Sequence, residues 1–173
     1  MAEQAECAPG HHYHLLGSWV KVGQQIRSLV LGEQHHVYKM GYCRAFGVDP
    51  GNTLNRGLNE RPSNSALQAI YIDAFLGSIL ADPAARDTEY VRSRALLSVI
   101  ASKFPVDAVF YPSVKDEWGT NVVITPDAVT NQMAYCASYV VRVNHVREFG
   151  VVETSLLRQA RGLTASGDFD WQE

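Results

Sequence analysis

Residues 106–125 read VDAVFYPSVKDEWGTNVVIT and consist of two apolar runs separated by a polar loop. The runs at 106–111 and 120–125 are rich in β-branched and aromatic residues, which favour strands. Proline and serine end the first run, and a glycine precedes the second. The segment therefore predicts two strands joined by a polar loop, with Ser113 either a turn residue or part of the rim of a site.

Two helices are predicted before these strands. In residues 65–82, apolar residues spaced at i, i+3, i+4, i+7 and i+8 form one face, and Ser65 with Gln68 is a capping-box signature. In residues 87–104, Asp87 or Thr88 can cap a second helix. The faces predicted to be apolar consist of Leu67, Ile70, Tyr71, Ala74 and Phe75 in the first helix and Leu96, Leu97, Ile100 and Phe104 in the second.

The remaining sequence is less regular. Residues 13–22 and 134–146 predict strands, and residues 148–157 are expected to pair with the latter. Weaker apolar segments lie at 26–31 and 35–47, and residues 126–133 suit a short helical turn. Residues 48–64 are predicted to be a loop because Pro50, Gly51 and Pro62 interrupt any periodicity.

Helices in the middle and strands late in the chain favour an α+β fold over a regular βαβ repeat. The length of 173 residues, 46% of them hydrophobic, suits one compact domain. We therefore predict a single domain over residues 1–162 and a flexible tail over residues 163–173, where the sequence is small, polar and acidic.

The composition also constrains partners and location. The net charge of −3 gives no basic surplus for a nucleic-acid or membrane partner. No apolar window is long enough to span a membrane, and the first ten residues lack the features of a signal peptide. Three scattered cysteines suit a reducing compartment. These features predict a cytoplasmic protein.

The first 43 residues contain several histidines and cysteines that are potential metal ligands. No C-x-x-C or H-x-x-x-H spacing occurs among them, and adjacent histidines in a strand point to opposite faces. Solvated or core-edge histidines are therefore favoured, with a metal enzyme as the alternative. The residues in question are Cys7, His11, His12, His14, His35, His36 and Cys43.

Several familiar catalytic motifs are absent from the sequence. It contains no G-x-G-x-x-G, G-x-x-x-x-G-K-[ST], G-x-S-x-G or H-E-x-x-H pattern, which removes support for the corresponding nucleotide-binding, hydrolase and peptidase classes. A triad could be assembled from Ser113, His145 and Asp107, but any chain of this size offers such a trio.

Residues 89–133 contain a more specific pattern. A helix that opens with Tyr90 and Ser93 leads to a D-A-V-F-Y-P-S-V strand, a polar loop and N-V-V-I-T-P-D-A-V. This pattern resembles the RES-domain family, whose members commonly carry dGi-YPSv…g-N-a-l-P-d-v in the same order. The similarity covers about residues 87–145, and it is carried by the combined pattern rather than by any single residue.

The resemblance implies an α+β fold similar to that of ADP-ribosyltransferases, with a mixed sheet and two central helices. Characterised RES domains consume NAD by hydrolysis, phosphorolysis or ADP-ribosyl transfer, and many are bacterial toxins held in check by a small DNA-binding antitoxin. By this resemblance, NAD is the expected substrate and an antitoxin is an expected partner.

The family is named for an arginine, a glutamate and a serine. Ser113 matches the serine, and Glu6, within AECAPGHHYHLLGSW, looks like the glutamate. The arginine lies further upstream in the family, on the first strand, but none of the five residues before Glu6 is an arginine. The chain thus resembles the C-terminal two-thirds of a RES domain, lacking the first strand.

Two alternatives follow from the missing arginine. The first strand and its arginine are supplied by a second chain, or the domain is a decayed, non-catalytic binding or assembly module. A missing first strand would leave an exposed sheet edge, which favours a complementing partner or self-association. Arg44, Arg56 and Arg61 lie in loop-like sequence and are candidates to replace the family arginine.

The chemistry of NAD cleavage explains these residue types. Breaking the nicotinamide–ribose bond creates an oxocarbenium-like state, which a carboxylate such as Glu6 stabilises. An arginine clamps the pyrophosphate, and the Ser113 hydroxyl can bind the nicotinamide side. Tyr111, Trp118 and Asn121 are further candidates to contact NAD, although each has a structural alternative in the core, at a hydrophobic edge or in the loop.

Overall fold

The computed structural model describes residues 8–114, 116, 118–148 and 151–172. It confirms the predicted α+β class, and its strands form two separate sheets. The chain divides into two compact units, whereas the sequence predicted one domain over residues 1–162. Ile26–Thr125 forms one, which we call the helical unit, and the residues up to Gln25 together with those from Pro126 onward form the other, the sheet unit. Each unit contains its own sheet.

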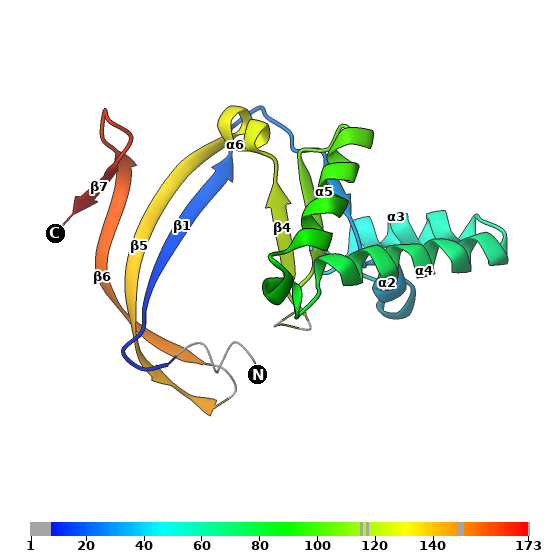
Figure 1. Cartoon of the computed structure of the whole chain (residues 1–173), viewed down its shortest axis with the longest axis horizontal. Helices are drawn as coiled ribbons and strands as arrows, with labels where there is room; N and C mark the ends of the chain where they lie inside the picture. The colour runs from blue at the N-terminus through cyan, green and yellow to red at the C-terminus, as the bar shows by residue number, and fades with distance from the viewer. Residues whose placement is uncertain (1–7, 115, 117, 149–150, 173) are drawn as a thin grey trace. The chain divides into compact units, whose positions relative to one another are not determined.

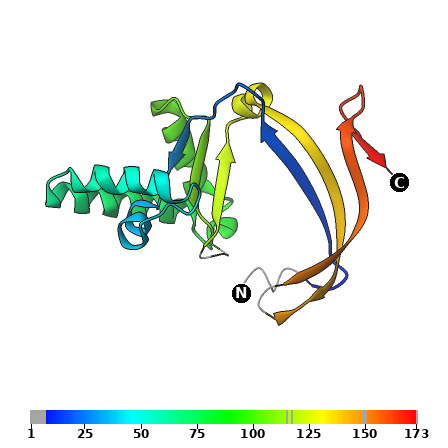
Figure 2. The same ribbon diagram turned by 180° about the vertical axis from the view of Figure 1, so that it is seen from behind.

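The sheet unit contains one antiparallel sheet in the order β1-β5-β6-β7. Its three long strands curve together along their length (Figures 1 and 2). The strands are β1 (His12–Val20), β5 (Met133–Val146), β6 (Val152–Leu163) and β7 (Phe169–Gln172), with the short helix α6 (Pro126–Gln132) before β5. The predicted strands at 13–22 and 134–146 and the helical turn at 126–133 are therefore confirmed.

Strand β7 lies in the segment that we predicted to be a flexible tail. Phe169 and Trp171 alternate along this strand, so their side chains share one face of the sheet. Both rings lie beside that of His14, at centroid distances of 5.3 and 5.6 Å, and Phe169 also contacts Tyr135. These aromatic contacts explain how a polar, acidic segment forms a strand.

The helical unit contains a three-stranded sheet with helices packed around it. The strands β2 (Ser28–Val30), β3 (Ala108–Pro112) and β4 (Thr120–Ile124) are ordered β2-β3-β4, with β2 parallel and β4 antiparallel to β3. The two strands predicted from residues 106–125 are thus confirmed. Leu31, Leu80, Ile100 and Val109 form the buried core.

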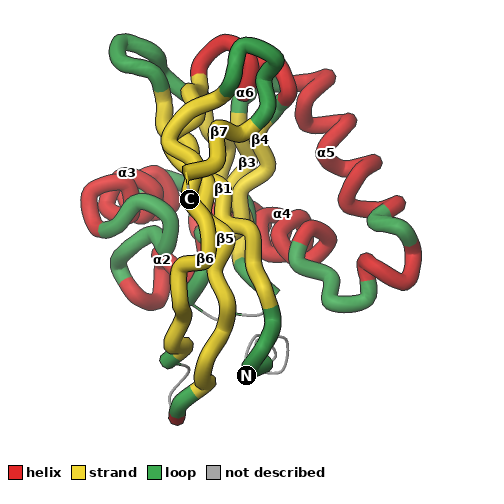
Figure 3. Tube along the Cα trace, turned by 90° about the vertical axis from the view of Figure 1, so that its left-hand side faces the viewer, coloured by secondary structure: helices red, strands yellow, loops and turns green. Residues whose placement is uncertain are grey.

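The described residues of this unit form five helical segments. Helix α4 packs against α2, α3 and α5 (Figure 3). The segments are α2 (Gln34–Met40), α3 (Val48–Asn59), α4 (Ser63–Leu80), the 3₁₀ turn η1 (Ala85–Thr88) and α5 (Val91–Lys103). Within the described residues, no helix is both long and apolar enough to cross a membrane.

Helices α2 and α3 correct the prediction for residues 35–64. Pro50 is the third residue of α3, where it removes no intrahelical hydrogen bond, so it does not break the helix. Gly51 lies against the backbone of Tyr42, so closely that a Cβ at this position would be 2.7 Å from the Tyr42 Cα. Pro50 therefore lies in the first turn of the helix, and Gly51 allows the helix to pack closely against Tyr42.

Helix α4 is confirmed, but its buried face is not the predicted one. Leu67, Tyr71 and Phe75 are exposed, while Asp73 and Gly77 are buried. The reason is that α4 approaches the backbone of the β2–α2 connection, where a small residue and a hydrogen-bond acceptor are needed. In α5, the predicted apolar face does meet the core through Leu96, Leu97 and Ile100, and Phe104 lies exposed beyond its end.

Candidate functional site

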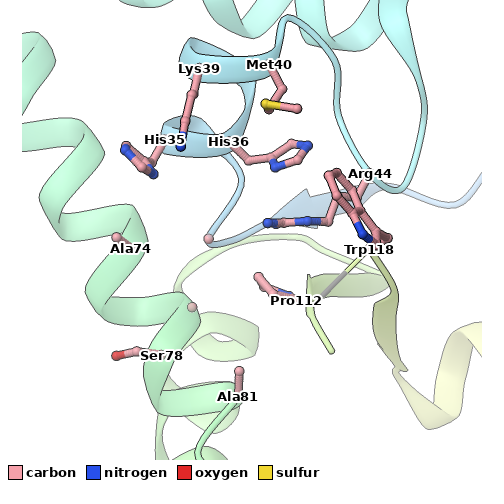
Figure 4. Close-up of a pocket in the computed structure, with 12 residues that line it drawn as sticks. His35, His36, Lys39, Met40, Arg44, Ala74, Ser78, Ala81, Pro112 and Trp118 are labelled. Atoms are coloured by element: carbon pink, nitrogen blue, oxygen red, sulfur yellow. The ribbon is translucent and has the colours of Figure 1, made fainter. Parts of the chain in front are cut away.

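A cavity of about 630 Å³ in the helical unit lies between α2, α4 and the β3–β4 loop. Its walls differ in chemistry (Figure 4). Helix α2 contributes basic side chains, α4 contributes only small residues, and the β3–β4 region contributes a proline and a tryptophan. The lining residues are Gly32, His35, His36, Lys39, Met40, Arg44, Ala74, Gly77, Ser78, Ala81, Pro112 and Trp118.

The start of α2 is fixed against α4 by backbone contacts. Gly32 has a positive φ of 74°, and a Cβ on Gly77 would lie only 2.6 Å from its Cα. The carboxylate of Asp73, which is 3% exposed, accepts a 2.8 Å hydrogen bond from the Gln34 N–H. Burial raises the pKa of Asp73, and the N–H groups around Glu33 only partly oppose this. Asp73 is therefore a structural anchor beneath the cavity.

Arg44 is held at the cavity by a buried carboxylate. Its Nη1 donates a 2.6 Å hydrogen bond to Glu33 Oε1, and its backbone N–H donates one of 2.9 Å to Oε2. The Glu33 residue is 1% exposed and the Arg44 side chain 15%. No described residue makes a hydrogen bond with the buried Nε of Arg44. The ion pair therefore fixes the guanidinium and leaves part of its donor capacity for another group.

His36 is the second residue with a buried, unsatisfied polar atom at this cavity. The residue is 8% exposed, and its Nε2 has no hydrogen-bond partner among the described residues. The ring makes edge contacts with Tyr42 at 4.9 Å and Trp118 at 6.2 Å between centroids. Burial, helped by the charge of Arg44, lowers the pKa of His36. Both effects favour the neutral form of the imidazole.

The β3–β4 loop brings Trp118 to the cavity while Ser113 supports the loop itself. The Ser113 hydroxyl accepts a hydrogen bond of 3.2 Å from the Asp116 N–H, and the Ser113 N–H donates to the Gly119 carbonyl. The Asp116 carboxylate in turn accepts from the Trp118 N–H at 3.0 Å. Pro112 lines the cavity, as does Trp118, which is 58% exposed. Ser113 is adjacent to the lining rather than part of it.

Tyr111 and Asn121 lie opposite each other on β3 and β4. A hydrogen bond joins their side chains, and burial raises the pKa of the Tyr111 phenol. Tyr111 also packs against the core cluster. Both predicted NAD contacts therefore belong to the sheet beside the loop, and neither lines the cavity.

The structure separates the three arginines that the sequence left equivalent. Arg44 lines the main cavity with Pro112 and Trp118. Arg61 lines a smaller cavity of about 310 Å³ between α2, α3 and α4, and Arg56 lies in the last turn of α3. Glu6, the predicted glutamate, lies outside the described residues.

The geometry gives less support to the other two candidate sites, which are the catalytic triad and the metal site. In the triad considered above, Asp107 in the helical unit pairs with Arg27 at 3.1 Å, and His145 belongs to the sheet unit. Among the described residues, no group of three or more histidine, cysteine or carboxylate side chains could hold a metal ion. Cys7, one of the suggested ligands, lies outside the described residues.

The sequence did not single out Glu33, His36 or Asp73 for these roles. His36 lies in the weak apolar segment predicted at residues 35–47, Glu33 lies just before that segment, and Asp73 lies in a helix predicted to bury another face. One signal was present, since an aspartate inside an apolar helix indicates a specific partner when that face is buried.

Comparisons with protein-family models, curated proteins and solved structures found no match to this chain.

Proposed function

We propose that the helical unit binds NAD in the cavity between α2, α4 and the β3–β4 loop. One observation carries the proposal: the loop that resembles a RES domain and a fixed arginine meet at this cavity. Pro112 is the last residue of β3 and Trp118 lies in the loop that follows. Arg44 lies across the cavity from the small residues of α4. The resemblance implies NAD as the ligand, and the cavity contributes groups suited to its parts.

The lining groups match the chemistry of a dinucleotide. Arg44 and Lys39 are cations that suit the negatively charged pyrophosphate. Trp118 offers a ring for stacking against adenine or nicotinamide. The opposite wall on α4 contains Ala74 and Ser78, which leave space for a flat ring. A volume of about 630 Å³ lies within the usual range for small-molecule sites.

A second candidate function is cleavage of the nicotinamide–ribose bond, as in characterised RES domains. Its support is Ser113, which matches the family serine and borders the cavity lining. The chemistry also needs a carboxylate near the ribose, but none of the described residues that line the cavity is Asp or Glu. Glu33 is buried behind Arg44 and serves to orient it. The geometry thus supports binding more directly than cleavage.

Two measurements on the purified full chain separate these functions. Calorimetric titration with NAD is expected to give saturable one-site binding, and the absence of binding would refute the proposal. Free nicotinamide is then followed with NAD, with and without phosphate. Release that disappears in Ser113→Ala would support cleavage, whereas binding without release would identify a non-catalytic binding module.

A matched pair of arginine variants tests the site of binding. Arg44→Lys keeps the charge opposite Glu33 but removes the planar fork, so NAD affinity should fall by roughly tenfold. Arg61→Lys makes the same change at the smaller cavity and should leave NAD affinity unchanged. Equal effects of the two variants would place NAD elsewhere.

A further inference from the structure

Two residues that line the same cavity, His36 and Arg44, each have a buried nitrogen atom without a hydrogen-bond partner among the described residues. His36 Nε2 lies on α2, and Arg44 Nε lies in the segment after it. Buried polar atoms in native proteins nearly always have partners, so an unpaired nitrogen beside a cavity marks a position where a ligand atom could bind. Figure 4 shows His36, Arg44 and Trp118 lying together beside Pro112.

The chemistry of the pair selects an anionic oxygen as the missing partner. Arg44 can only donate hydrogen bonds, and one of its other nitrogens is already bound to Glu33. A phosphate oxygen accepts several hydrogen bonds at once, so it can satisfy Arg44 and a donating His36 together.

We propose that His36 and Arg44 form a phosphate subsite, in which His36 takes up a proton from solvent when the pyrophosphate of NAD binds. The inference rests on the proposed function and identifies a residue that recognises the ligand. The proton is held on the imidazole ring, and Nε2–H donates to a phosphate oxygen. His36 is a binding residue here, not a catalytic one.

The surroundings of His36 explain the proton uptake. His35 and Lys39 on α2, Glu33 before it, and Tyr42 and Arg44 after it are the charged or titratable groups nearby. The α4 residues that line the cavity do not titrate, and neither do Pro112 and Trp118. The titratable group of α4 that contacts α2 is Asp73, whose carboxylate accepts the hydrogen bond from the Gln34 N–H. In the free protein, burial and Arg44 lower the His36 pKa. A phosphate group counters the Arg44 charge and attracts a proton, so the pKa rises on binding.

NAD is a suitable probe because its pyrophosphate is a diester, which has no ionisation near neutral pH, unlike a phosphate monoester. Calorimetry at about pH 6, 7 and 8, in pairs of buffers with different ionisation enthalpies, measures affinity and proton uptake together. For the wild-type chain we expect affinity several-fold higher at pH 6 than at pH 8, with uptake of a fraction of one proton.

Three variants assign the effect to His36. His36→Phe keeps an aromatic ring and should weaken NAD binding by roughly tenfold and abolish its share of the proton uptake. His36→Gln keeps an amide donor that does not titrate, so it should restore part of the affinity but none of the uptake. His12→Phe, on exposed β1 of the sheet unit, should match the wild type in both.

The outcomes separate this inference from the proposed function. If NAD binds but His36→Phe retains the wild-type affinity and uptake, the subsite is wrong and NAD binding stands. If NAD does not bind, inorganic pyrophosphate is titrated instead. Pyrophosphate binding that requires His36 and Arg44 would support the subsite and refute NAD as the ligand. No binding of either probe would overturn both.

Discussion

The Glu33 carboxylate accepts hydrogen bonds from both the side chain and the backbone of Arg44. The Nη1–Oε1 distance is 2.6 Å, and the backbone N of Arg44 lies 2.9 Å from Oε2. The carboxylate thus ties the start of α2 to the segment that follows the helix and directs the guanidinium toward the cavity. An arginine fixed in this way loses little freedom when it binds an anion.

Replacing Glu33 with glutamine should destabilise the helical unit. Glutamine is close in shape but leaves the mostly buried guanidinium without its charge partner, which typically costs about 3 kcal/mol. Urea unfolding followed by circular dichroism measures the loss. Glu153→Gln removes the corresponding partner of Arg147 from an exposed ion pair and should have little effect. Comparable losses in the two variants would show that burial of the Glu33–Arg44 pair is unimportant.

The buried carboxyl group of Asp73 should appear in the pH dependence of stability. Because burial raises its pKa in the folded chain, folding favours the protonated form. Its contribution to stability is present below the unfolded pKa of about 3.9 and is lost as the pH rises through the folded pKa. Asp73→Asn removes this titration, so the unfolding free energy of the variant, minus that of the wild type, should increase with pH above about 4. A constant or decreasing difference would contradict the assignment.

Trp118 should contribute to ligand affinity without contributing to stability. Its side chain is 58% exposed, so Trp118→Ala should change the unfolding free energy little. Loss of stacking against a base typically costs 1–3 kcal/mol, so NAD affinity should fall by roughly tenfold. Trp19→Ala is the matched control because Trp19 is equally exposed but lies on β1. Unchanged NAD affinity in Trp118→Ala would remove the ring from the site.

Two glycines in helices should respond oppositely to alanine. A Cβ on Gly77 would meet the Gly32 backbone at 2.6 Å, so Gly77→Ala should push α2 away from α4 and destabilise by about 2 kcal/mol. In α3, a Cβ on Gly57 meets nothing within 4 Å, and Gly57→Ala should stabilise by about 0.5 kcal/mol through helix propensity. Thermal unfolding of both variants checks the prediction, and a tolerated Gly77→Ala would refute the close helix contact.

Local sequence patterns correctly predicted several helices and strands. The strands β3 and β4, the helix α5 and the long strand β5 follow from periodicity, strand propensity and punctuation by proline and glycine. Helix α3 was missed because Pro50 and Gly51 look like a turn. Only the contact of Gly51 with Tyr42 shows that its small size serves packing. Strand β7 was missed because Phe169 and Trp171 acquire partners only in the folded sheet.

The candidate site could be predicted only in part, because the roles of its residues depend on contacts that form only in the folded chain. Trp118 was suspected because an aromatic residue in a polar loop is unusual, and it lines the cavity. Arg44 could not be chosen over Arg56 and Arg61, because its distinction is a buried partner 11 residues away. The orphaned nitrogen of His36 has no sequence signal at all, since it depends on what surrounds the ring.

The most direct test of NAD binding in the cavity is calorimetry on a chain whose cavity is filled. Ala74 lines the cavity and is exposed on α4, so Ala74→Trp places a bulky ring in it without disturbing the Glu33–Arg44 pair. Ile72→Trp puts the same ring on an exposed position of α4 that does not line the cavity. We predict that the wild type and Ile72→Trp bind NAD with the same affinity, while Ala74→Trp shows no measurable binding. Equal NAD binding by all three chains, or none by the wild type, would contradict the account.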